Sequence, residues 1–318
     1  MAQAAPPPFP PPELVFRVSA SADLEEFDRI GLASREAVDR SLPEGWDWSG
    51  KRMLDFGCGA GRMLRHYLPE AAAGAEIEGC DQHPESVAWM RDNLSPPLVV
   101  FPNGEHPPLP VEDGRYDLVV AVSVFTHIVR GWSEWLLELH RVLRPGGLLL
   151  ATFHGPGMGP EFEALLGVPY EEERTGMLVL PTGPDLEFAN VFHSPWWLRA
   201  HWGRAFEILL LDESGFGTER GRGHGVLLMR RRESDLEPAA LERPEPGEPR
   251  EAEAQAHAIE VLFDFGQRLR QRSERLEEEL GLARSRLEAL EGSRSWRLTR
   301  PLRTAGAALR ARSPRGLG

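Results

Sequence analysis

The sequence predicts an α/β protein built on a doubly wound, mostly parallel, Rossmann-like sheet of seven strands. Between residues 51 and 153, short apolar runs alternate with segments of helical periodicity, which is the pattern of repeated strand–helix units. One run, residues 117–124 (D-L-V-V-A-V-S-V), is almost continuously apolar, as expected of a central strand covered on both faces. A turn with glycines at Gly57, Gly59 and Gly61 directly follows the first run, and sheets of this kind bind ligands beside such turns.

The individual strands and helices follow from the same periodicity. Strands are expected at residues 51–56, 76–80, 98–101, 117–124, 148–153, 206–211 and 226–229. Helices are expected at residues 23–40, 84–94, 132–143 and 196–202, with a further helix opening at residues 62–68. Asp23 suits an N-cap and Pro84 suits a first helical turn. The Gly-rich connection at residues 215–225 indicates that the last two strands are antiparallel to each other.

A long insert interrupts the strand–helix rhythm at residues 155–193. It is rich in Gly and Pro, and it contains a short helical piece at residues 161–166 and a hairpin-like stretch at residues 177–192. Long irregular segments inside a compact domain usually carry function. We therefore expect the insert to shape a substrate pocket or to form a lid over it.

The two ends of the chain differ in composition from the sheet-forming domain, which we place at residues 16–231. Residues 1–15 are proline-rich and are expected to be a disordered tail. Residues 232–253 are expected to be a charged linker with three Glu-Pro steps. Residues 254–292 indicate one amphipathic or coiled-coil helix, and residues 293–318 form a basic tail rich in Arg.

The predicted helix at residues 254–292 carries a heptad pattern of unequal strength. Leucine fills most d positions, whereas Gly266 and Ser273 occupy a positions. Two structures fit this pattern: a coiled coil, which would make the protein a homodimer, and a single amphipathic helix docked on the domain. The basic tail, with Trp296, suits either contact with an anionic membrane surface or an unstructured segment.

Composition excludes several classes of protein. The net charge of −13 argues against a nucleic-acid binder, which would carry a basic face. The two cysteines, Cys58 and Cys80, allow neither a disulfide framework nor a Cys-rich zinc site, so we expect buried thiols and no metal. The N-terminus lacks a basic-then-apolar leader, and no apolar run reaches the ~20 residues of a membrane span. We expect a cytoplasmic protein, peripheral to the inner membrane face if the basic tail binds lipid.

The spacing of the glycine turn separates two kinds of nucleotide site. A dinucleotide fingerprint, G-x-G-x-x-G, has its third glycine where this chain has Arg62. The stretch M-L-D-F-G-C-G-A-G-R, with Asp55 before G-x-G-x-G, resembles motif I of the class I S-adenosylmethionine-dependent methyltransferases. Three alternatives stay open: a structural glycine turn in another α/β fold, a nicotinamide-dependent oxidoreductase, and a non-catalytic scaffold that keeps the cofactor-binding fold.

The resemblance implies that S-adenosylmethionine is the cofactor, and it assigns residues to it. Asp55 would hold the charged amino-acid end of the cofactor beside the turn at Gly57, Gly59 and Gly61. Asp81, at the end of the second strand, would bind both ribose hydroxyls, at a spacing from the glycine turn that is typical of nucleotide folds.

Three further cofactor contacts follow from the same resemblance. Gln82 would border the adenine pocket, and Ser123 would contribute backbone contacts near the methionine part of the cofactor. Glu105 stands where an acid meets the adenine amine in the family. Because additional prolines blur the register of this segment, Asn103 is the alternative for that role, and plain exposure of Glu105 in a loop is another.

His127, at the end of the fourth strand, is the candidate catalytic residue. Methyl transfer needs a positioned acceptor and, for a hydroxyl acceptor, removal of its proton. A histidine beside the methyl donor suits that task near neutral pH. A structural histidine that fixes the loop is the alternative, and His154, at the end of the fifth strand, is a second candidate base on the same rim.

The acceptor is expected to be a small molecule or a glycan, with a sugar hydroxyl as the methylated group. Residues 135–155 resemble bacterial methyltransferases associated with surface-polysaccharide assembly, and residues 293–303 resemble segments of glycan enzymes. Trp132, Trp196 and Trp197 are either sugar-stacking surfaces or core residues.

Overall fold

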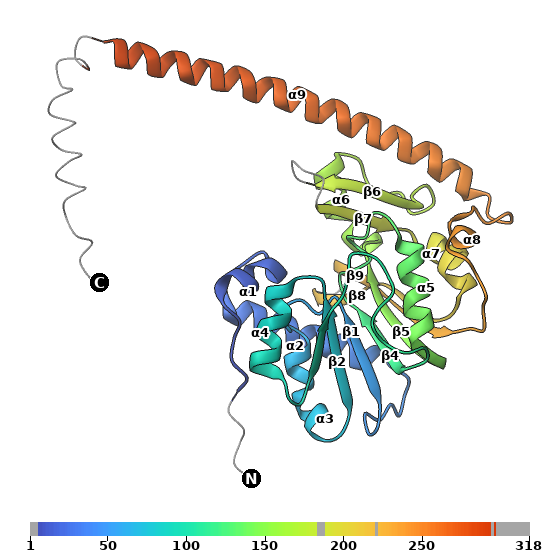
Figure 1. The fold of residues 1–318 in the computed structure, drawn as a ribbon. Helices are drawn as coiled ribbons and strands as arrows, with labels where there is room; N and C mark the ends of the chain where they lie inside the picture. The colour runs from blue at the N-terminus through green and yellow to red at the C-terminus, as the bar shows by residue number, and fades with distance from the viewer. Residues whose placement is uncertain (1–5, 183–187, 220–221, 294–295, 297–318) are drawn as a thin grey trace, which may run out of the picture. The chain divides into compact units, whose positions relative to one another are not determined.

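A seven-stranded sheet forms the centre of the fold, in the strand order β3-β2-β1-β4-β5-β9-β8 (Figure 1). The strands are β1 (Arg52–Phe56), β2 (Glu76–Asp81), β3 (Val99–Pro102), β4 (Tyr116–Ala121), β5 (Leu143–Phe153), β8 (Phe206–Glu219) and β9 (Arg222–Arg231). The pairs β1–β2, β1–β4, β2–β3 and β4–β5 are parallel, whereas β9 is antiparallel to both of its neighbours. The predicted mostly parallel sheet of seven strands is therefore confirmed.

The structure is a computed structural model that describes residues 6–182, 188–219, 222–293 and residue 296. The chain divides into two units, Met1–Ile259 and Glu260–Gly318. The sheet and its covering helices belong to the first unit.

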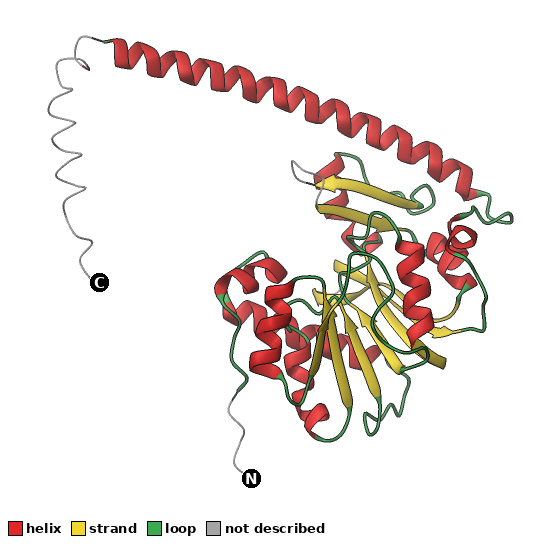
Figure 2. Cartoon of the chain, viewed as in Figure 1, coloured by secondary structure: helices red, strands yellow, loops and turns green. Residues whose placement is uncertain are grey.

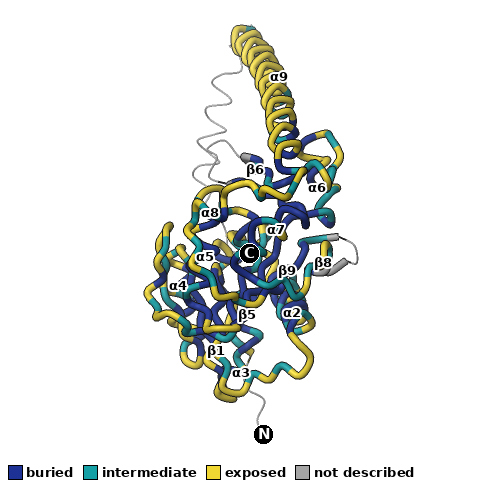
Figure 3. The backbone as a smooth tube through the Cα atoms, turned by 90° about the vertical axis from the view of Figure 1, so that its right-hand side faces the viewer, coloured by how far each residue is buried: buried dark blue, intermediate teal, exposed yellow. Residues whose placement is uncertain are grey.

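Helices cover both faces of the sheet (Figure 2). They are α1 (Pro12–Ser19), α2 (Leu24–Ser41), α3 (Leu68–Ala72), α4 (Pro84–Leu94), α5 (Trp132–Val142), α7 (Pro195–His201) and α8 (Pro238–Glu242), together with the 3₁₀ helices η1 (Leu64–Tyr67) and η3 (Trp202–Arg204). Side chains of α2, η1 and α4 pack on one face, and those of α5, α7 and α8 pack on the other. Alternate residues of β5 face the two cores: Leu148 and Leu150 enter one, and Leu149 and Ala151 enter the other. The sheet strands are accordingly buried (Figure 3).

The predicted insert forms a separate layer at the carboxyl ends of the parallel strands. It contains η2 (Pro156–Met158), α6 (Gly159–Leu166) and an antiparallel pair, β6 (Met177–Thr182) with β7 (Phe188–His193). The expected hairpin is therefore present. Backbone bonds attach it to the segments that follow β4 and β5, since the N–H of Val191 donates to the Thr126 carbonyl and the N–H of His193 donates to the His154 carbonyl.

Two predicted element boundaries are wrong near the site. The helix expected to open at Arg62 is a turn followed by η1, and α-helix begins only at Leu68, where Pro69 suits a first helical turn. The fourth strand ends at Ala121 instead of continuing to residue 124. Ser123 has a φ of 57°, a left-handed backbone conformation that cannot continue a strand.

The prediction that residues 1–15 form a disordered tail is wrong from Pro12 onward, because α1 begins there and buries Leu14 and Val15. The segment before it is also held. The guanidinium of Arg65 donates to the Pro7 carbonyl over 2.7 Å and lies 4.0 Å from the centre of the Phe9 ring. Residues 1–5 lie outside the described part of the chain.

The prediction that residues 232–253 form a linker is also wrong. They include α8 and the first residues of helix α9 (Arg250–Gly292), and Leu241 is completely buried. His201 ties the segment to the domain, because its Nδ1 donates to the Leu241 carbonyl and its Nε2 lies 2.8 Å from the Glu251 carboxylate. The first unit therefore extends past residue 231 to Ile259.

Helix α9 continues through the second unit to Gly292, as the sequence predicted. Of the basic tail at residues 293–318, the structure describes only Ser293 and Trp296. Among the helices of the described ranges, none combines the length and the apolar character that crossing a bilayer requires.

Replacement of Leu241 tests whether the segment after residue 231 belongs to the folded domain. We expect Leu241→Ala to lower the free energy of unfolding by about 3 kcal/mol, because it removes a fully buried side chain from the core. Denaturant unfolding followed by tryptophan fluorescence measures the change. The exposed Leu282 supplies the control, since Leu282→Ala should leave this transition unchanged within about 0.5 kcal/mol. If the two variants unfolded at the same denaturant concentration, residues 232–253 would be a linker, as the sequence predicted.

Candidate functional site

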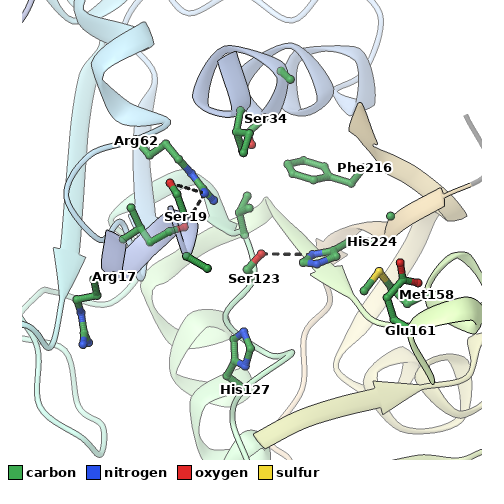
Figure 4. Close-up of a pocket in the computed structure, with 16 residues that line it drawn as sticks. Arg17, Ser19, Ser34, Arg62, Ser123, His127, Met158, Glu161, Phe216 and His224 are labelled. Carbon is green, nitrogen blue, oxygen red and sulfur yellow. Dashed lines mark hydrogen bonds between the residues drawn. The ribbon is translucent and has the colours of Figure 1, made fainter. Parts of the chain in front are cut away.

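A cleft with a volume of about 1230 Å³ lies at the carboxyl ends of β1, β2 and β4. Asp55, Gly57, Gly59, Asp81, Gln82 and Ser123 all line it, together with α1, Arg62 and His127. A second cavity of about 590 Å³ adjoins it, and Arg62, Ser123 and His127 line both. Figure 4 shows the second cavity, with Ser123 facing His224 near its centre. Ligands of parallel sheets bind at this edge.

The glycine turn is held in a backbone conformation that side chains disfavour. Gly57 has a φ of 77° and Gly59 a φ of 55°. A Cβ on Gly57 would lie 2.6 Å from Val124 Cγ2, and a Cβ on Gly59 would lie 2.6 Å from Val18 Cγ1. The turn therefore needs glycine both for its backbone angles and for the close approach of neighbouring side chains.

Two backbone N–H groups orient the Asp81 side chain, which lines the cleft. The Gly59 N–H donates to its Oδ2 and the His83 N–H donates to its Oδ1, each over 2.8 Å. A carboxylate oxygen can accept more than one hydrogen bond. Asp81 can thus remain bonded to the turn while it accepts hydroxyl groups of a ligand.

Asp55 is a buried carboxylate that lacks a hydrogen-bond donor among the described residues. Its side chain lines the cleft although the residue is only 3% exposed. Burial, with a smaller contribution from the negative charge of Asp81, raises its pKa to about 7 against the opposing positive charge of Arg62. A cationic ligand group at this position would supply the missing counter-charge. The ammonium of S-adenosylmethionine fits that requirement, so Asp55 and the glycine cradle are compatible with the cofactor.

Arg62 fastens the N-terminal helix to the glycine turn. Its Nη1 donates to the Val18 carbonyl over 2.6 Å and lies 3.5 Å from Ser19 Oγ. Burial lowers its pKa, and the Asp55 charge opposes that change. In the sequence, Arg62 was informative only because it stands where a dinucleotide fingerprint has its third glycine. In the structure it makes α1 one wall of the cleft.

The remaining predicted cofactor residues differ in position. Gln82 and Ser123 line the cleft. Gly61 does not: a Cβ there would lie 3.0 Å from Met90 Cε, so this glycine permits packing of the turn against α4. Glu105 is exposed and lies outside the lining of both cavities. The alternative, Asn103, donates its side-chain amide to the Gly104 carbonyl.

His127 is held in one tautomer. Its Nδ1 lies 2.9 Å from the Ala189 carbonyl oxygen in β7. A carbonyl can only accept a hydrogen bond, so in the neutral ring Nδ1 carries the proton and Nε2 carries the lone pair. Because His127 lines both cavities, this arrangement supplies a proton acceptor at their junction.

A second histidine in the site, His224 on β9, was not predicted. Its Nδ1 lies 3.3 Å from Ser123 Oγ and 3.4 Å from Thr152 Oγ1, and its Nε2 lies 3.2 Å from His154 Nε2. Burial lowers its pKa to about 4, so it is neutral at pH 7. A histidine between two glycines, in the connection just before the strand expected at residues 226–229, was the available sequence signal.

His154, the second candidate base, lies behind His224 and outside the lining of both cavities. It is 4% exposed, and burial together with the neighbouring His224 lowers its pKa to about 2. It follows β5 at the carboxyl edge of the sheet, as expected, but its burial leaves it unable to reach an acceptor in either cavity. Within the described residues, no group of three or more histidine, cysteine or acidic side chains is arranged to hold a metal ion.

The tryptophans considered as sugar-stacking surfaces are core residues. Trp132, Trp196 and Trp197 are all buried, and the rings of Trp132 and Trp197 pack edge to face with centroids 5.1 Å apart. Cys58 and Cys80 are free and buried as expected, and burial raises the pKa of both thiols.

Comparisons with known proteins agree with this geometry. Residues 54–151 match the family model described as a methyltransferase domain. The chain is 34% identical over 143 residues to a phthiotriol/phenolphthiotriol dimycocerosates methyltransferase of Mycobacterium ulcerans. The aligned region covers 45% of this chain and 49% of that protein. It is 33% identical over 144 residues to a fatty-acid O-methyltransferase of Mycolicibacterium smegmatis. That alignment covers 45% of this chain and 52% of the relative. The chain thus spans about half the length of these curated relatives.

A solved structure shows the same fold. It is the "Complex between the Haloferax volcanii Trm112 methyltransferase activator and the putative methyltransferase", aligned with a TM-score of 0.50 and 16% identity over 70% of this chain and 98% of that one. The chain therefore contains a methyltransferase domain, and its sheet has the Rossmann-like fold of that solved structure.

The pH dependence of cofactor binding tests the role of Asp55. A ligand cation favours the ionised carboxylate, so binding below pH 7 must release the proton that the raised pKa retains. We expect the affinity for S-adenosylmethionine, measured by calorimetry, to fall roughly tenfold between pH 7 and pH 5.5. Asp55→Asn is the matched control and should bind more weakly with little pH dependence. An equal pH dependence in the variant would assign the titration to another group.

Proposed function

We propose that this chain is an S-adenosylmethionine-dependent methyltransferase that methylates a hydroxyl oxygen of a small-molecule acceptor. The observation that carries the proposal is the position of His127. Its unprotonated Nε2 belongs to a residue that lines both the cofactor cleft and the adjoining cavity. A proton acceptor at that junction is the group that methylation of a hydroxyl requires.

The cleft residues would hold the cofactor by complementary charge and hydrogen bonds. Asp55 would pair with the ammonium group, and Asp81, held by Gly59 and His83, would accept the ribose hydroxyls. When bound, S-adenosylmethionine supplies a methyl group already activated by its sulfonium charge. The task left to the protein is to position the acceptor and remove its proton.

In this proposal His127 takes the acceptor proton at Nε2 while its Nδ1–H remains bonded to the Ala189 carbonyl. The imidazolium formed in this way is stabilised by that same bond. His224 is neutral, and its two ring nitrogens contact Ser123 and His154, so it would position Ser123 in the wall of the cavity without adding a charge there.

Two acceptor classes are proposed for the adjoining cavity. A sugar hydroxyl, or a glycan carrying one, is supported by the sequence resemblances of residues 135–155 and 293–303. A hydroxyl on an apolar, lipid-like body is supported by the relatives, whose names include fatty-acid and ubiquinone O-methyltransferases. The apolar side chains of Ile30, Met158 and Phe216 on the cavity wall favour this second class.

The insert and the chain ends enter the proposal as accessory parts. Met158 and Glu161 bring the insert into the wall of the acceptor cavity, in keeping with a pocket-forming role. Contact of the basic tail with the inner membrane face remains a prediction about residues that mostly lie outside the described part. A role of Glu105 at the adenine amine would need movement of its loop.

Two rival functions are tested by binding and turnover. Tight binding of NADH without binding of S-adenosylmethionine would favour an oxidoreductase. Cofactor binding without S-adenosylhomocysteine production over broad panels of sugar and lipid acceptors would favour a non-catalytic scaffold. Mass spectrometry of products from both panels identifies the acceptor class and the methylated atom.

Replacement of His127 tests the proposed base. We expect His127→Ala to lower turnover at least ~100-fold, because general-base catalysis contributes about that much, while cofactor affinity stays unchanged. Turnover is followed by S-adenosylhomocysteine release and affinity by calorimetry. The variant His106→Ala, at an exposed loop histidine, is the control and should retain full activity. Normal turnover in His127→Ala would make His127 a structural residue.

A further inference from the structure

The second unit exposes a stripe of apolar side chains along α9. With Leu262 at position d of a heptad, the d positions are Leu262, Leu269, Leu276, Ala283 and Leu290, and the a positions are Gly266, Ser273, Leu280 and Leu287. Each leucine in this set is exposed, from 38% for Leu262 to 59% for Leu290. A regular stripe with period 3.5 is the surface that one helix presents to another in a coiled coil. We call these positions the seam.

Charged residues flank the seam, and their signs alternate along the helix. The g positions carry Arg272, Glu279 and Arg286, and the e positions that lie five residues further on carry Glu277, Arg284 and Glu291. All of these side chains are exposed. In a parallel, in-register pair of helices, each g residue faces the e residue five positions further along the other helix. Every one of these contacts would join opposite charges.

We propose that α9 pairs with α9 of a second copy of this chain as a parallel, in-register coiled coil. Three ion pairs then flank each side of the seam: Arg272 with Glu277, Glu279 with Arg284, and Arg286 with Glu291 of the second copy. The leucines at d form the apolar layers between the helices. Ser273 at an a position faces its own copy, and a single polar a residue fixes register at some cost in stability.

The charges favour this orientation over the reverse. An antiparallel pairing of the same length aligns Leu262 with Leu287 and joins Arg272 with Glu279 and Arg270 with Glu277 of the second copy. It leaves Arg286 opposite Phe265 and gives two ion pairs on each side instead of three. The parallel dimer leaves Arg270 facing Phe265, but it pairs all the g and e charges from Arg272 to Glu291, which the antiparallel arrangement does not.

Charge reversal tests the pairing in the full-length chain. We expect the wild-type protein to sediment as a dimer in analytical ultracentrifugation at micromolar concentration. The double variant Arg272→Glu, Arg286→Glu places like charges at both ends of each side, and its dissociation constant should rise about 100-fold. Adding Glu277→Arg and Glu291→Arg restores opposite charges and should return the constant to within about tenfold of the wild-type value.

This restoration distinguishes pairing from a general effect of charge on solubility or folding. Circular dichroism and tryptophan fluorescence verify that each variant remains folded. A wild-type chain that is monomeric at about 100 μM would overturn the proposal, as would a double variant that dimerises as well as the wild type. Neither result bears on the methyltransferase assignment, because that assignment rests on the first unit.

Cross-linking tests the orientation. In the proposed dimer, position 276 faces its own copy at a distance that a disulfide can bridge, within about 7 Å between Cα atoms. Leu276→Cys should therefore form a covalent dimer under mild oxidation, and Gln271→Cys, at an outward f position, should not. The native Cys58 and Cys80 are buried and give little background. Cross-linking only between Leu276→Cys and Ser273→Cys chains would overturn the parallel arrangement.

Discussion

The hydrogen bond from the Gly59 N–H to the Asp81 carboxylate is the interaction on which the site depends. It joins the turn after β1 to the tip of β2. The adjacent N–H groups of Gly57 and Cys58 both donate to the Cys80 carbonyl, so the turn and the second strand form one rigid unit. Because these donors are used in this way, none reaches Asp55, and the cleft keeps a buried carboxylate with a pKa raised to about 7. A site that holds an uncompensated negative charge in a cleft selects a ligand with a positive charge.

The same rigid turn sets the position of segments that are remote in sequence. Arg62, which begins the turn after the glycines, binds the carbonyl of Val18 and so places α1 across the cleft. Val18 in turn occupies the space that a side chain on Gly59 would need. The substitution of arginine for the third glycine of a dinucleotide fingerprint therefore does more than exclude a close helix–strand contact. It replaces that contact with a side chain that anchors the cover of the cofactor site.

Local patterns predicted the sheet, and remote contacts explain what they missed. Alternation of apolar runs located every strand of the sheet, although β8 continues eight residues past its predicted end and β5 begins five residues before its predicted start. The spacing of Gly57, Gly59 and Asp81 located the cleft, because both signals lie within short segments. The packed segment around Leu241 was mistaken for a linker, since its Pro and Glu content is typical of linkers. It is held by His201, which contacts Leu241 and Glu251 from about 40 and 50 residues away. His224 meets Ser123 across about 100 residues, and a single sequence carries no signal for such a pairing.

The insert links the choice of acceptor to the chemistry of the base. Its strand β7 supplies the Ala189 carbonyl that keeps the proton on His127 Nδ1, while its residues Met158 and Glu161 line the cavity proposed for the acceptor. The main chain of β7 is itself fixed to the sheet through the Val191 N–H and the Thr126 carbonyl. A change in the insert that moves β7 would therefore alter both the shape of the cavity and the basicity of Nε2. Under the proposed function, acceptor specificity and proton removal would therefore be coupled, because one insert contributes to both.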